Sequence, residues 1–192
     1  MRRFVFILLL SAWTCSYGQA ERELPDRYLF DQVMITGSTN MNEFHLDYRE
    51  SDFSGIPSCI QGKDDTFRFL IPAGRIKAES KMMRTDFLEM IHADKYPDIV
   101  ITLGENIVGE LRGSSILNHR IGLTLNGVTN NYQVKSVKEE GPSGQWLLSG
   151  AVKIRLSNFK IDPPKKFLGL VKVNDEVLIN FKILFAANRG TR

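Results

Sequence analysis

Apolar and polar residues alternate along most of this chain, which is the pattern of β-strands with one buried face. In residues 175–186, for example, the apolar face begins with Val177 and ends with Phe185, while Glu176 and Lys182 point to the opposite side. Eight such segments, separated by glycine, proline and charged turns, favour an all-β fold, an antiparallel barrel rather than an open sheet. The segments are 28–37, 43–50, 65–72, 98–104, 114–125, 128–138, 145–157 and 175–186.

Residues 79–97 have helical spacing instead. Met83, Phe87 and Met90 recur at intervals of three, four and seven residues, so they share one side of a helix. Lys81, Arg84 and Glu89 fall elsewhere around the helix, where they are expected to face water. We therefore expect a helix that covers a mouth or a side of the barrel with its apolar face.

The ends of this helix are also predicted by local signals. Ser80 is a good N-cap for the first turn. Pro97 excludes helical geometry at the residue before it, so the helix is expected to reach the proline and lead directly into strand 98–104. The irregular stretch 158–175 contains two adjacent prolines and a glycine, and no long helix is expected there.

The first 18 residues have the features of a secretory signal peptide. Arg2 and Arg3 give a positive start, and the apolar stretch that follows is shorter than the roughly 20 residues of a membrane-spanning helix. Small residues then precede a cleavage site before Gln19. We expect residues 1–18 to be removed, leaving residues 19–192 as a single domain in the periplasm or outside the cell.

A lipoprotein signal, with a lipid anchor on Cys15, is the alternative for this N-terminus. Cleavage before Gln19 leaves Cys59 as the only cysteine, so no intramolecular disulfide can form. Removing two arginines changes the formal net charge from 25 − 22 = +3 to 23 − 22 = +1. This near-neutral charge, without a basic run, argues against nucleic acid as a partner.

Motifs for catalysis and metal binding are missing from the sequence. His45, His92 and His119 lack the paired spacing of metal ligands. His92 fits a helix C-terminus, and His119 is in phase with leucines, which predicts burial beside a hydrogen-bond partner. Ser157 and Lys160 match a serine-x-x-lysine spacing, but the companion motifs of such hydrolases are missing. We predict no catalytic residue, no metal site and no cofactor. A hydrolase would require His92 or His119 beside a serine or carboxylate in a cleft.

Three segments together resemble the YceI-like family of secreted bacterial proteins: "AGRIKAESKMMRTDFLEMIHADKYPDIVITL" (73–103), "LTLNGVTNNYQV" (123–134) and "LSNFKIDPPKKFLGLVKVNDEVLINFKILF" (156–185). The resemblance extends over roughly Tyr28 to Ala187. It implies a lipocalin-like eight-stranded antiparallel barrel with one or two short covering helices. It also implies an elongated apolar lumen that holds a polyisoprenoid chain, such as a quinone tail.

On this resemblance, the leading hypothesis is a periplasmic protein that binds a long-chain apolar lipid without catalysis. The alternative is a filled barrel that holds no ligand and acts through its surface, and a homodimer is open in either case. We expect Met83, Phe87 and Met90 to form an adaptable gate. The side chains expected to line the cavity are Phe44, Phe67, Phe69, Ile99, Ile101, Trp146, Leu148, Phe181 and Ile183.

Overall fold

Antiparallel strands dominate the computed structural model, which describes residues 27–52, 59–61, 66–104, 107–141, 145–163, 165–166 and 171–186. The predicted signal peptide and Cys15 lie outside these residues. Eight strands have six or more residues, and each coincides with one predicted segment, so that prediction is confirmed. They are β1 (Arg27–Ser38), β2 (Glu43–Arg49), β4 (Phe67–Pro72), β6 (Asp98–Leu103), β7 (Ile116–Leu125), β8 (Val128–Glu140), β9 (Trp146–Arg155) and β12 (Glu176–Ala186).

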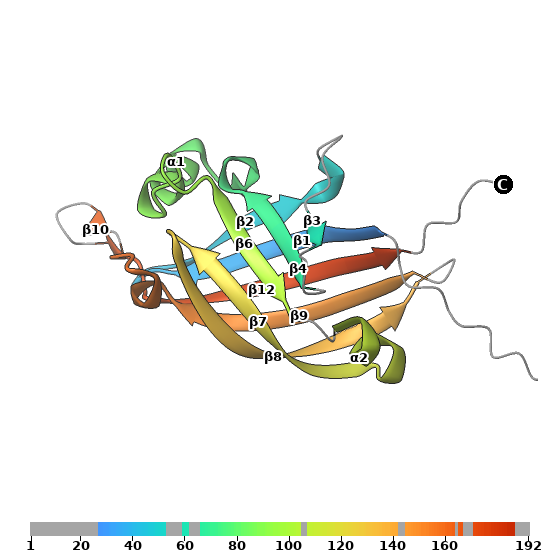
Figure 1. The fold of residues 1–192 in the computed structure, drawn as a ribbon. Helices are drawn as coiled ribbons and strands as arrows, with labels where there is room; N and C mark the ends of the chain where they lie inside the picture. Colours follow the sequence, from blue (N-terminus) through green and yellow to red (C-terminus); the bar gives the residue numbers. More distant parts are fainter. Residues whose placement is uncertain are drawn as a thin grey trace, which may run out of the picture.

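These strands form one strongly curled sheet, which encloses the apolar core as a half-barrel (Figure 1). The order across the ten-stranded sheet is β3-β4-β6-β7-β8-β9-β12-β1-β2-β5. Two short strands, β3 (Cys59–Gln61) and β5 (Lys77–Ala78), form its edges, while β10 (Lys165–Lys166) pairs separately with β11 (Val171–Lys172). Alternate residues from Val177 to Phe185 on β12 are buried, as the alternation predicted.

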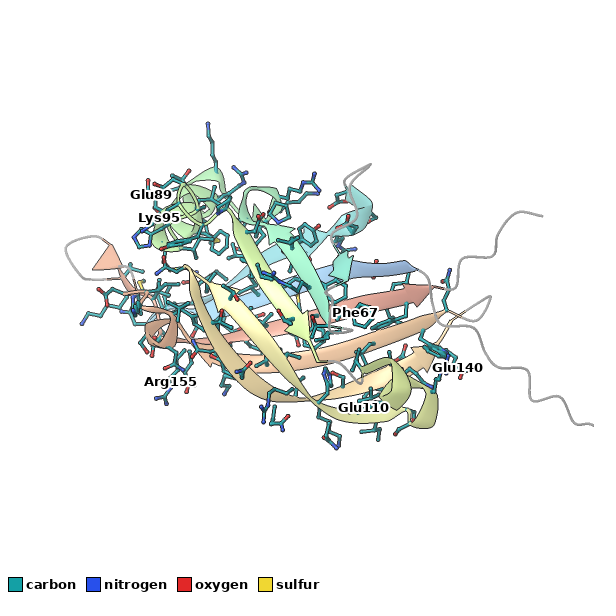
Figure 2. All side chains as sticks on the ribbon, in the orientation of Figure 1. Phe67, Glu89, Lys95, Glu110, Glu140 and Arg155 are labelled. Atoms are coloured by element: carbon teal, nitrogen blue, oxygen red, sulfur yellow. The ribbon has the colours of Figure 1, made fainter. Side chains whose placement is uncertain are left out.

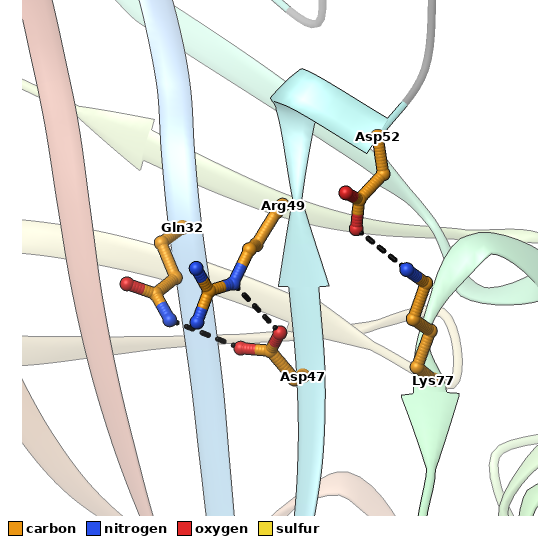
Figure 3. A network of polar contacts seen from close by, with 5 residues as sticks. All are labelled: Gln32, Asp47, Arg49, Asp52 and Lys77. Carbon is orange, nitrogen blue, oxygen red and sulfur yellow. Dashed lines mark hydrogen bonds and ion pairs between the residues drawn. The ribbon is translucent and has the colours of Figure 1, made fainter.

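The chain itself joins β4, the strand beside the edge strand β3, to the edge strand β5. β4 leads through the 3-10 turn Ala73–Arg75 into β5, which pairs with β2 through only two residue pairs. Beside this pairing, Lys77 Nζ lies 2.8 Å from the Asp52 carboxylate (Figure 3). On the neighbouring β1–β2 ladder, Asp47 accepts hydrogen bonds of 3.1 Å from both Gln32 and Arg49. We call this corner, where β5 pairs with β2 and is connected through the turn to β4, the seam.

The predicted covering helix is present as α1 (Lys81–Met90). Ser80 caps it as expected, because its hydroxyl accepts a hydrogen bond from the Met83 amide. The helix ends earlier than predicted, however. His92 adopts a left-handed conformation with φ of 52°, and turns then carry the chain to Pro97. The end of the helix is therefore set by this left-handed residue and not by the proline.

A second short helix, which the predicted architecture of one or two helices allows, is α2 (Ile107–Gly113), but the sequence did not indicate its position. Its two glycines and its short length give a weak helical signal. It forms because Ile107 and Leu111 are buried against the sheet, and because Lys138 Nζ donates a hydrogen bond of 2.7 Å to the Leu111 carbonyl. The helices lie at opposite ends of the curled sheet (Figure 1). In the described part of the chain, neither is long and apolar enough to cross a membrane.

Candidate ligand-binding site

An enclosed cavity of about 50 Å³ lies in the barrel interior at the α1 end. All side chains around it are apolar, and most are aliphatic. They come from seven strands, from α1 and from the segments beside them, since alternate residues of each strand face inward. The lining residues are Val33, Ile35, Phe44, Leu46, Ile71, Ile76, Phe87, Met90, Ile91, Ile99, Ile101, Leu123, Leu125, Ile154, Leu156, Val173, Val177 and Ile179.

A second, open space of about 240 Å³ adjoins this cavity, and we call it the mouth. One side of the mouth is the apolar face of α1, and the other is formed by β2 and β11. Ser80, Asp86 and Thr39 bring polar groups to its lining. The remaining residues of the lining are Phe44, Leu46, Met82, Met83, Phe87, Met90, Val171 and Val173.

Five residues line both spaces: Phe44, Leu46, Phe87, Met90 and Val173. We call the three with the largest side chains, Phe44, Phe87 and Met90, the partition between the mouth and the cavity. Phe87 is almost fully buried, whereas Phe44 and Met90 are half-buried. Phe44 also packs over Gly37 on the facing strand, where an added Cβ would lie 2.3 Å from its ring. Methionine has three rotatable bonds and adapts its shape readily. Met90 is therefore the member of the partition that moves most easily.

The predicted lining residues fall into two groups. Phe44, Phe87, Met90, Ile99 and Ile101 line the cavity, and Met83 lines the mouth. The others contribute to neither space but are buried further along the barrel: Phe67, Phe69, Trp146, Leu148, Phe181 and Ile183. Figure 2 shows Phe67 on β4, at the end away from α1, whereas Glu89 and Lys95 mark the α1 end.

Several lining residues were missed by the sequence interpretation. Leu123 and Leu125 lie on the apolar face of a predicted strand, so the alternation could have indicated them. Val173 had no such signal, because it follows the short strand β11 and reaches the site through an isolated bridge to Thr39.

Toward α2 the barrel interior is filled mainly by aromatic rings. Phe67, Phe69, Phe181 and Phe185 are each 2% exposed or less, and Trp146 is 5% exposed. We call this part of the interior the filled end, and the part around the cavity the hollow end.

One polar pair interrupts the apolar interior on the way to the filled end. His119 is buried as predicted, and its Nε2 lies 2.8 Å from the hydroxyl of Ser136, which is fully buried. Burial lowers the pKa of His119, because desolvation disfavours the imidazolium form. Across the ladder, Gly150 makes room for this hydroxyl and for the Phe181 ring, since an added Cβ would lie 2.5 Å from each.

This pair has the serine-to-histidine distance of a nucleophile and its base, but no third group orients the imidazole. Among the described residues, the other ring nitrogen of His119 has no hydrogen-bond partner, and the pair lines neither space. Ser157 donates to Asp175 at 2.7 Å, which lowers the pKa of that carboxyl. No cluster of metal-ligating side chains occurs in the described ranges. The geometry around the cavity thus supports binding of apolar groups.

Sequence and structure comparisons place this chain among known proteins. The sequence model of the YceI-like domain matches residues 30–185. The chain belongs to the YceI-like family. No curated protein matches its sequence.

Solved structures share the fold at low sequence identity. A polyisoprenoid-binding domain from Saccharophagus degradans, implicated in plant cell wall breakdown, is 10% identical with a TM-score of 0.67, over 86% of this chain and 99% of that one. BcnA from Burkholderia cenocepacia is 16% identical with a TM-score of 0.57, over 79% and 95% of the two chains. The lipocalin-like barrel predicted for this YceI-like chain is therefore confirmed as its fold class.

Proposed function

We propose that this YceI-like protein binds a long-chain apolar lipid of the isoprenoid class, such as a quinone tail, and that it does so without catalysis. The observation that carries the proposal is an enclosed cavity with only apolar lining, beside an open mouth that shares five of its lining residues. Membership of the family and the fold shared with a polyisoprenoid-binding domain support it.

The energy of such binding comes from burial of hydrocarbon. Each buried methylene contributes about 0.8 kcal/mol, so a tail segment of roughly six methylenes would gain about 5 kcal/mol. The cavity of about 50 Å³ is narrow, so the tail would enter by displacing the flexible Met90 and the ring of Phe87. Rearrangement of these side chains would use part of the gain. The binding free energy would thus come from burial of the tail, and the side chains of the partition would move to make room for it.

Export belongs to the proposal as well. The signal peptide expected at residues 1–18 would deliver the mature protein to the periplasm or the exterior, where it would carry or store the lipid. The N-terminal residue of the purified exported protein tests this part. Gln19 at the N-terminus would support cleavage by signal peptidase, whereas acylated Cys15 would support the lipid-anchored alternative.

Lipid binding is tested by organic extraction of the purified protein, mass spectrometry of the extract, and titration with farnesol and a longer polyprenol. Ile179→Phe places a larger side chain in the cavity wall, and we expect it to weaken binding by roughly tenfold or more, because about two methylenes lose their space. Leu178→Phe is the matched control, since Leu178 is the next residue of β12 and is exposed on the outer face.

Equal affinity of both variants would contradict the assignment of the site to this cavity. A protein that carries no lipid after purification and takes up neither alcohol would contradict the proposed function itself. That second result would favour the alternative, a barrel without ligand that acts through its surface.

A further inference from the structure

Left-handed backbone is concentrated at one place beside the hollow end. In the described part of the chain, the residues other than glycine with positive φ are His92, Asn126 and Lys160, with φ of 52°, 52° and 57°. They come from the end of α1, from the turn between β7 and β8, and from the end of the 3-10 turn Leu156–Phe159. Hydrogen bonds of one side chain, Asn126, join the three segments.

The Asn126 amide faces partners on two sides. Its Nδ2 donates to the carbonyl oxygens of Phe159 at 3.0 Å and Lys160 at 3.4 Å. Its Oδ1 therefore points the other way, 3.0 Å from Nδ1 of His92, which must carry the proton and donate it. The side chain of the turn thus ties the C-terminus of α1 to the 3-10 turn that follows β9.

The conformation of His92 indicates why a histidine matters here. The amides of His92 and Ala93 donate to the carbonyls of Glu89 and Leu88, which is the Schellman ending of a helix. Glycine is the residue that adopts the left-handed position of this motif at least cost. A histidine at this position makes the helix end less stable than a glycine would. Its side chain, however, forms the hydrogen bond with Asn126 that glycine could not form.

The Asn126 turn has its own geometric requirement, which is separate from this contact. Asn126 and Gly127 both have positive φ, as a two-residue type I′ turn needs. Tyr96 packs directly on Gly127, where a Cβ would lie 2.5 Å from the ring. Glycine at position 126 would keep the turn but delete the amide, so the two roles of Asn126 can be separated by experiment.

The helix held by this contact carries the partition. Phe87 and Met90 lie within the last turn of α1, just before His92. Nearer its N-terminus, α1 is attached by Arg84, whose guanidinium donates to the carbonyls of Gly74 and Ile76. We propose that the hydrogen bond between His92 and Asn126 is a latch on the C-terminal end of α1, and that it opens when a ligand passes the partition. The ligand part of this inference rests on the proposed function, whereas opening of α1 can be measured without a ligand.

The test compares His92→Gly and Asn126→Gly with the parent protein. Amide hydrogen exchange of α1, followed by mass spectrometry, reports opening of the helix, and stopped-flow release of a fluorescent prenyl lipid reports ligand exchange. We expect His92→Gly to speed both by about threefold, although glycine improves the helix end, because one exposed hydrogen bond is lost. Asn126→Gly should do the same at α1.

Asn130→Ala is the matched control, because Asn130 lies on the same hairpin and donates to the Asn158 carbonyl at 3.0 Å without contacting α1. It should leave α1 exchange unchanged. The double variant with glycine at positions 92 and 126 should open α1 no faster than Asn126→Gly alone, since both remove the same contact.

Unchanged α1 exchange in Asn126→Gly would overturn the latch, because this variant deletes the amide partner of His92 and leaves the helix end as it is. Faster α1 exchange with an unchanged release rate would overturn its role in ligand passage. Faster α1 exchange in protein that takes up no lipid would keep the latch on α1 and overturn the proposed function instead.

Discussion

The hollow end and the filled end of the barrel are built from the same strands with the same alternation, yet their interiors differ. Around the cavity the inward residues are mainly isoleucine, leucine and valine, whereas toward α2 they include Phe67, Phe69, Phe181 and Phe185. Rings are large enough to meet across the interior, and the shorter aliphatic chains are not. The size of the inward side chains differs along the barrel axis, whereas the alternation of the strands does not. Side-chain size therefore determines where the interior contains a cavity.

Truncating one ring at each end should give the largest difference. Phe181→Ala removes a fully packed ring from the filled end and should lower the free energy of unfolding by about 3–5 kcal/mol. Phe87→Ala at the partition should cost roughly half as much, because this ring already borders two spaces and loses fewer contacts. Urea denaturation of both variants checks this. Equal losses would show that the partition is packed as tightly as the core.

Enlarging one side chain at each end, instead of truncating it, should also affect the stability of the two ends differently. Ile183→Phe adds volume to the filled end and should destabilise the protein by about 1–3 kcal/mol through overpacking. Ile179→Phe, four residues earlier on the same face of β12, should change stability by less than about 1 kcal/mol, because the cavity accepts the ring. Thermal melts of the two variants check this. A lower melting temperature for Ile179→Phe than for Ile183→Phe would contradict the difference between the hollow end and the filled end.

Substitutions in the pair of His119 and Ser136 should change the free energy of unfolding least. Replacing both, as His119→Leu with Ser136→Ala, removes a buried nitrogen that has no hydrogen-bond partner, and should leave stability unchanged or raise it by about 1 kcal/mol. His119→Leu alone should be less stable than the double variant, because it leaves the buried Ser136 hydroxyl without this partner. Chemical denaturation at neutral pH measures all three proteins.

This histidine also predicts a dependence on pH. Its folded pKa is lowered from 6.5, so below pH 6.5 the unfolded chain binds a proton that the folded protein does not. The free energy of unfolding should therefore fall as the pH drops from 6.5 to the folded pKa, by at most about 1.4 kcal/mol per pH unit. The double variant, His119→Leu with Ser136→Ala, has no imidazole at this position, so its free energy of unfolding should fall less over the same pH range. Parallel curves for the two proteins between pH 7.5 and 5 would exclude the effect.

Most of the fold could be predicted from the sequence, because its signals are local. The period-two alternation gives each long strand, and Ser80 gives the start of α1. The end of α1 could not be predicted, since His92 occupies a position where glycine is the usual signal. α2 depends on burial of Ile107 and Leu111 against distant strands, which no local pattern expresses.

The candidate site could be predicted only in part, for a related reason. Alternation identifies inward residues such as Ile101 and Phe69, but not how far each lies along the barrel axis. That depth depends on the register between strands, for example Ile101 opposite Leu123 and Phe69 opposite Ile101. Whether a given depth is open or filled then depends on the summed volumes of all residues at that level.

The short β2–β5 pairing at the seam affects how easily the circumference of the barrel can change. The ladders between long strands contain four or more residue pairs each, whereas the β2–β5 joint contains only Leu46 with Ala78 and Asp47 with Lys77. Local opening of a protein begins where the fewest hydrogen bonds must break. The circumference can therefore increase at this joint while every long ladder stays intact. Because Leu46 also lines both the cavity and the mouth, such expansion would add width where a guest molecule is expected to enter.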